Sequence, residues 1–152
     1  MKIELTKEVR ARMASCLVKA KQREIGGILM GEQLKPGEFR VIDFSLDDTS
    51  GSATQFVRLP ERHNAVLDAF FTRTGNDYAR FNYLGEWHSH PNYALAPSAI
   101  DIITMHNLLD EENNIPFAIL LIVKKGWCRR FKCSATLFNR NKKMSRIQVI
   151  KK

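Results

Sequence analysis

Two histidines and an aspartate between residues 88 and 101 have the residue types and the spacing of a metal site. The segment reads HSHPNYALAPSAID, so His88 and His90 are two residues apart and ten residues separate His90 from Asp101. Side chains alternate along a β-strand, which places both imidazoles on one face. Two imidazoles and a carboxylate are enough for a catalytic zinc, which takes three protein ligands and leaves a fourth position for water. The ligand mix also suits zinc. The segment therefore predicts a hydrolytic zinc centre.

The last part of this segment also fits a purely structural pattern. Ser98 and Asp101 form Ser-x-x-Asp after a proline, which is a capping box at the start of a helix. The two interpretations are compatible, because a capped first turn would aim Asp101 back toward the histidines. The other two histidines, His63 and His106, have no such neighbours and are interpreted as ordinary residues.

A hydrolytic centre needs a carboxylate that takes a proton from water and delivers it to the leaving amine. Two glutamates are candidates for this general base. Glu24 precedes the glycine-rich apolar run GGILMG, whereas Glu86 precedes His88 by two residues and shares its face of the strand. Spacing alone does not choose between them.

Composition limits the class of protein. A length of 152 residues predicts one domain, residues 1–152. The longest apolar run, FAILLIV at 117–123, is too short to span a membrane, and no signal peptide is recognised, so we expect a cytoplasmic protein without a membrane partner. Three cysteines argue against a disulfide framework. The net charge of +8 suggests nucleic acid, but the basic residues are scattered and no recognition motif accompanies them.

The spacing of apolar residues predicts a mixed α/β domain, with a sheet packed against two or three helices. Thr6 caps the first predicted helix, which ends near Ala20. The other expected helices span residues 61–74 and 98–110. Strands are expected at residues 24–31, 39–46, 53–59, 82–90, 116–125, 128–138 and 145–150. We expect the strand at 116–125 to be buried on both faces and the strand at 145–150 to lie at an edge.

Taken together, Glu24 with GGILMG, then HSHP, then Ser98 and Asp101, resemble the JAB/MPN+ (JAMM) family of zinc metalloproteases. The match covers almost the whole chain, and the combined motif is highly specific. The resemblance implies the cytidine-deaminase-like JAB/MPN fold. It also implies that His88, His90 and Asp101 bind Zn²⁺, that Glu24 rather than Glu86 is the general base, and that Ser98 helps to hold the oxyanion.

The resemblance further implies a substrate class. Members of the family cleave amide or isopeptide bonds after the C-terminal glycine of ubiquitin or ubiquitin-like proteins. A short chain without insertions is similar to the stand-alone bacterial deconjugases of CBASS-type antiphage operons. The implied partners are a ubiquitin-like protein or a conjugated CD-NTase-type nucleotidyltransferase with its target, and the cognate activating or conjugating enzyme. The HxHP signature is shared with RadC-like proteins, so a basic module associated with nucleic acid, with a vestigial metal site, is the alternative.

Overall fold

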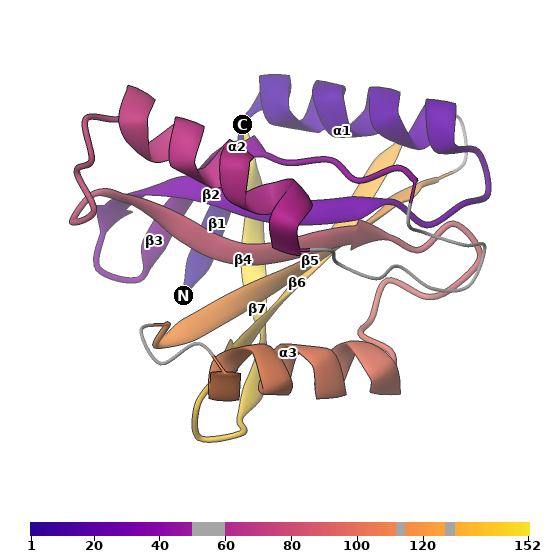
Figure 1. Ribbon diagram of the computed structural model, residues 1–152. Coiled ribbons are helices and arrows are strands. Elements are labelled where there is room, and N and C mark those ends of the chain that lie inside the picture. Colours follow the sequence, from indigo (N-terminus) through magenta and orange to yellow (C-terminus); the bar gives the residue numbers. More distant parts are fainter. Residues whose placement is uncertain (50–59, 112–114, 127–129) are drawn as a thin grey trace.

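A mixed sheet of seven strands, closed into a barrel, organises the part of the chain that the structure describes (Figure 1). This computed structural model describes residues 1–49, 60–111, 115–126 and 130–152, and the side chains of the second helix from residue 63 onward. The strand order is β1-β3-β2-β4-β5-β6-β7, and β7 pairs with β1. The pairs β1–β3, β1–β7 and β4–β5 are parallel, and the others are antiparallel. The elements are β1 (Lys2–Leu5), α1 (Lys7–Ala20), β2 (Gly26–Lys35), β3 (Glu38–Phe44), α2 (Pro60–Arg73), β4 (Phe81–Ser89), α3 (Ala99–Glu111), β5 (Phe117–Lys125), β6 (Phe131–Asn139) and β7 (Met144–Lys151).

The interior of the barrel is one apolar cluster to which all seven described strands contribute side chains. Helix α1 packs on this cluster through residues spaced three or four apart, Val9, Met13, Leu17 and Ala20. Its first turn is held by Thr6, whose hydroxyl oxygen accepts a hydrogen bond from the backbone N–H of Val9 at 3.2 Å. The predicted cap and the predicted end of this helix are both confirmed.

Helices α2 and α3 lie against the outer surface of the barrel, over different strands (Figure 1). Phe70 of α2 packs on Ile28 and Met30 of β2. Helix α3 covers β5 and β6, where Leu120 and Phe138 are in its cluster. Strand β5 is therefore buried on both faces, as its continuous apolar sequence predicted.

Several strands differ from the sequence prediction. Strand β1 was not expected, because four residues are too few to show a clear alternation. The segment 145–150 was expected to be an edge strand, and this was wrong, because β7 pairs with β6 on one side and with β1 on the other. The strand expected at 24–31 starts later, at Gly26, and extends to Lys35. The strand expected at 53–59 lies outside the described residues.

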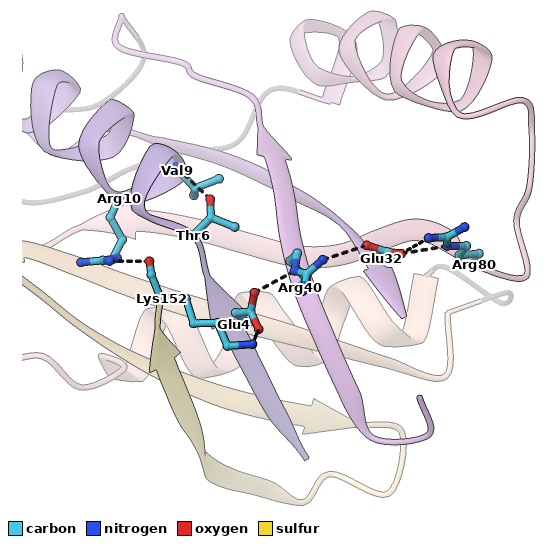
Figure 2. A network of polar contacts seen from close by, with 8 residues as sticks. All are labelled: Glu4, Thr6, Val9, Arg10, Glu32, Arg40, Arg80 and Lys152. Carbon is cyan, nitrogen blue, oxygen red and sulfur yellow. Dashed lines mark hydrogen bonds and ion pairs between the residues drawn. The ribbon is translucent and has the colours of Figure 1, made fainter. Parts of the chain in front are cut away.

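Charged side chains form a row of ion pairs near the point where β7 pairs with β1 and closes the barrel (Figure 2). Glu4 of β1 accepts a hydrogen bond from Arg40 Nε of β3 at 2.7 Å and pairs with Lys152 Nζ at 2.7 Å. Arg40 also lies 3.6 Å from Glu32 of β2, which pairs with Arg80. The backbone N–H of Lys152 donates to the carbonyl of Leu5 at 3.1 Å. This ionic row joins β1, β2 and β3 to Arg80, just before β4, and to Lys152, just after β7.

Candidate metal centre

A bulge in β4 decides which way the two histidines face. The pairing of β4 with β2 shifts by one residue after Gly85, so that Leu29 opposes Gly85 but Met30 opposes Tyr83. Leu84 and Trp87, three residues apart, consequently both point into the barrel. Past the bulge, the alternation places Trp87 inside and His88 outside.

Gly85 makes this bulge possible. Its φ is 140°, and a Cβ added there would lie 2.0 Å from the carbonyl oxygen of Ile119 on β5. Any other residue would force the two strands apart at the point where they are parallel neighbours.

The end of β4 is tied to both of its neighbours. Ser89 donates its N–H to the carbonyl of Ile25 at 2.8 Å, and its hydroxyl accepts the N–H of Ile25 at 3.0 Å. The N–H of His90 donates to the carbonyl of Val123 on β5 at 3.0 Å. The histidine pair is thus fixed to the sheet at its last residue, although His90 itself lies just beyond the strand.

The structure brings His88, His90 and Asp101 together. The two Nε2 atoms lie 3.0 Å apart, and Asp101 Oδ1 and Oδ2 lie 3.4 Å from His88 Nε2 and 3.5 Å from His90 Nε2, respectively. Zinc bonds of about 2.0–2.1 Å in tetrahedral geometry separate the ligand atoms by about 3.3 Å. The donor set and its spacing therefore fit a zinc ion. That the three residues bind one remains a prediction.

Hydrogen bonding orients the second histidine. Nδ1 of His90 lies 2.8 Å from the carbonyl oxygen of Ala94. A carbonyl only accepts, so Nδ1 must carry the proton, and the lone pair of a neutral imidazole is then on Nε2, the atom that faces His88 and Asp101. A carbonyl behind a ligating histidine is the usual way to fix its tautomer and ring plane.

His90 and Asp101 of the centre shift each other's pKa values. Burial opposes a positive charge on His90. In the protonated ring, however, Nε2–H can donate to Asp101 while Nδ1–H donates to Ala94, and these bonds, with the negative charges of Asp101 and Glu24, outweigh burial and raise the pKa of His90. Burial would by itself raise the pKa of Asp101. Its hydrogen bonds with His88 and His90 nevertheless hold that pKa well below the usual range. Asp101 is therefore an anion at any physiological pH.

Ser98 and Asp101 form the predicted capping box. The N–H of Ser98 donates to Asp101 Oδ2 at 2.6 Å, and the N–H of Asp101 donates to the Ser98 hydroxyl at 3.1 Å. The cap holds Asp101 in the first turn of α3, from which its carboxylate reaches both histidines. Ser98 is exposed, and its bond to Asp101 uses an oxygen lone pair and leaves the hydroxyl hydrogen available.

Both candidate bases are buried, with 4% exposure at Glu24 and 6% at Glu86. Glu24 comes immediately before Ile25, which is bonded to Ser89, and its negative charge contributes to the raised pKa of His90. Glu86 lies on β4, opposite Ile28 of β2 and Leu120 of β5. Glu24 thus comes from the segment between α1 and β2 and lies beside the end of the histidine segment.

The remaining histidines lie outside the group. His63 is buried against Ser45, with Nδ1 2.6 Å from the hydroxyl oxygen, and His106 packs edge-on against the ring of Phe138. Sequence reasoning missed two polar residues that bind the segment between His90 and Ser98. These are Lys124 and Ser134, which lie on β5 and β6, and no local pattern marks them.

Comparisons with known proteins identify the family of the chain. Residues 6–139 match the family described as prokaryotic homologs of the JAB domain, and the chain belongs to that family. Among curated proteins, none matches the chain.

Two solved structures share the fold. The solution structure of protein DSY2949 from Desulfitobacterium hafniense has a TM-score of 0.72 at 22% identity, with 99% of this chain and 92% of that one covered. The solution structure of a protein from Salinibacter ruber has a TM-score of 0.59 at 20% identity, covering 98% of this chain and 91% of that one. The resemblance inferred from the sequence is confirmed at the level of the family and the mixed α/β fold.

Within the described segments, we find no helix with both the length and the apolar character needed to cross a membrane.

Proposed function

We propose that the chain is a zinc-dependent isopeptidase that cleaves the amide bond after the C-terminal glycine of a ubiquitin-like protein, and so reverses its conjugation. The observation that carries this proposal is the convergence of His88, His90 and Asp101 beside the buried Glu24. Membership of the JAB family supports a hydrolytic role. Removal of conjugates in a CBASS-like antiphage system is the biological setting that we propose for it.

The protein side chains would divide the work of hydrolysis. His88, His90 and Asp101 would hold the ion. A bound zinc supplies Lewis acidity, which polarises a carbonyl and makes water more acidic. The Glu24 carboxylate takes a proton from the attacking water while the oxygen of that water forms a bond to the carbonyl carbon. Glu24 then delivers the proton to the nitrogen of the leaving amine. The C–N bond breaks, and a carboxylic acid and an amine are released.

Ser98 is available for a different task. Its exposed hydroxyl lies three residues before a metal-site carboxylate and can donate its hydrogen to the oxyanion that develops on the carbonyl. The amide hydrogen bond that Ser98 already accepts keeps its oxygen in place.

A direct test compares Glu24→Gln with Glu86→Gln. Glutamine keeps the size of glutamate but cannot accept the proton, so Glu24→Gln should retain its zinc and lose at least about a hundredfold in rate. Glu86→Gln should lose far less. The substrate is a ubiquitin-like protein with a fluorescent amine joined to its C-terminal glycine. Wild-type cleavage by Glu24→Gln together with an inactive Glu86→Gln would overturn the assignment of the base.

Metal analysis tests the centre independently of cleavage. The purified protein should contain about one zinc per chain, the number expected for one set of three ligands. Replacing both His88 and His90 with alanine should remove it. Full zinc content in the double variant would mean that the ion binds elsewhere.

A further inference from the structure

We propose that Lys124 and Ser134 are positioning residues of the metal centre, which hold the loop of residues 91–97 so that His90 and Asp101 face each other. This inference rests on the zinc centre proposed above. Three consecutive carbonyl oxygens of the loop each accept a hydrogen bond from a side chain. Lys124 Nζ donates to Tyr93, His90 Nδ1 to Ala94 and Ser134 Oγ to Leu95, each at 2.8 Å.

The loop has little else to fix its path. It joins the end of β4 to the start of α3, and it therefore links one ligand segment to the other. Between described residues, no backbone-to-backbone hydrogen bond involves residues 91–97. Asn92, Tyr93 and Ala94 are exposed, while Leu95 packs on the apolar cluster beneath α3. The three side-chain bonds are consequently the main polar restraints on the loop.

The two outer bonds come from side chains on two paired strands, β5 and β6. Ser134 of β6 pairs with Ile122 of β5, and Ile122 pairs with His88 of β4, so these residues form one row across three strands. Ser134 is 5% exposed. Lys124 lies one alternation further along β5 on the same face. The sheet that carries His88 therefore also sets the position of the loop.

The middle bond shows why this matters for a metal. The carbonyl of Ala94 sets the tautomer of His90, and it lies between the two carbonyls that Lys124 and Ser134 hold. If either outer bond is lost, the Ala94 carbonyl is less well placed, and so is the helix start that carries Asp101. Removal of partners behind metal ligands typically weakens metal binding by about 10- to 100-fold.

The experiment uses pairs of variants with matched shape. Ser134→Thr keeps the hydroxyl, whereas valine in Ser134→Val has nearly the shape of threonine but no hydroxyl. Lys124→Arg keeps a donor, whereas Lys124→Met does not. Lys132→Met removes the same charge from the residue directly opposite Lys124 on β6 and is the control. Zinc affinity is measured by competition with a chelator of known affinity, which does not depend on cleavage.

We expect the zinc dissociation constant to rise about tenfold in Ser134→Val and a few-fold in Lys124→Met. The conservative variants and Lys132→Met should stay near wild type. Equal zinc affinities for Ser134→Val and Ser134→Thr would overturn the role of the hydroxyl. An equal loss of zinc affinity in Lys132→Met and Lys124→Met would show that the charge of Lys124 matters and its hydrogen bond to the loop does not.

Backbone nitrogen-15 NMR relaxation in the metal-free protein separates this inference from the proposed function, because it reports motion of the loop backbone and does not require its amides to be hydrogen-bonded. The order parameters of residues 92–96 should fall in Ser134→Val but not in Ser134→Thr. If the wild type bound no zinc while this difference remained, the metal centre would be wrong and the restraint on the loop would stand. If zinc bound normally and the order parameters did not differ between the two variants, the inference about the loop would be wrong.

Discussion

Asp101 takes part in two structures at once. It caps the first turn of α3 through the N–H of Ser98, and it faces both histidines. The structural interpretation of Ser-x-x-Asp and the chemical one are therefore not alternatives here. The same cap that starts the helix also sets where the carboxylate lies.

Ser98→Ala separates the two roles of the serine. Loss of a cap costs about 1 kcal/mol of stability, whereas loss of an oxyanion donor costs about a hundredfold or more in turnover. We expect a strong fall in kcat with a small change in melting temperature, and Ser98→Thr should retain the cap. A large fall in melting temperature with normal turnover would leave Ser98 with the structural role alone.

Zinc binding should weaken as the pH falls. Zinc binds neutral imidazole, and the raised pKa of His90 means that protons compete for this ligand already above the ordinary histidine value of about 6.5. Below that raised pKa, each unit of pH should cost at least about tenfold in affinity, since the proton on His90 must be displaced before the ion binds. Asp101 contributes nothing in this range, because its pKa is depressed and it stays ionised. Titrations of zinc affinity between about pH 5 and 8 check this, and a flat profile would contradict it.

At the scale of elements, the bulge in β4 has a larger effect than its size suggests. It shifts the alternation of the strand by one residue, so that Trp87 faces the core and His88 faces outward. A regular strand through Leu84 would have turned both histidines into the apolar interior.

Gly85→Ala should therefore be severely destabilising. The added methyl group meets the backbone of Ile119, and a φ of 140° is strained for alanine, so we expect a loss of about 3 kcal/mol or more in the free energy of unfolding. Gly37→Ala is the control, because its φ is 75° but nothing lies within 4 Å of the added methyl, and about 1 kcal/mol is expected. Chemical denaturation measures both. Similar losses in the two variants would mean that the contact with β5 is unimportant.

At the scale of the whole molecule, closure of the barrel brings opposite charges into a partly buried row. Glu4 and Glu32 are 5% and 7% exposed, and Arg40 lies between them. Hydrogen bonds from Lys152 and Arg40 keep the pKa of Glu4 below its usual value. A carboxylate in such a place depends on its partners, because burial alone disfavours its charge.

Arg40→Met tests this dependence. It leaves two buried carboxylates with one partner fewer, and we expect a loss of about 2 kcal/mol, below the range for fully buried pairs because Arg40 is itself partly exposed. Lys142→Met breaks an exposed pair with Asp110 and should cost less than about 1 kcal/mol. Denaturation curves of the two variants give the comparison. Equal losses would show that the row is no different from an ordinary surface ion pair.

The sequence by itself determined what depends on neighbours a few residues away. The apolar face of α1, the caps at Thr6 and Ser98, the burial of β5 and the spacing of His88 and His90 follow from local periodicity and hydrogen bonding. These features are short-range, so their pattern is visible in a single chain.

Only the tertiary structure decided what depends on pairing between distant segments. Four features join residues that are far apart in sequence. They are the closure of the barrel by the four-residue β1, the position of β7 between β6 and β1, the place of Glu24 beside His90, and the hydrogen bonds from Lys124 and Ser134 to the loop. Strand pairing is set by the sum of contacts over the whole sheet, and a one-residue shift such as the bulge at Gly85 reverses every side chain beyond it. No local pattern contains that sum, because the partners meet only when the barrel closes.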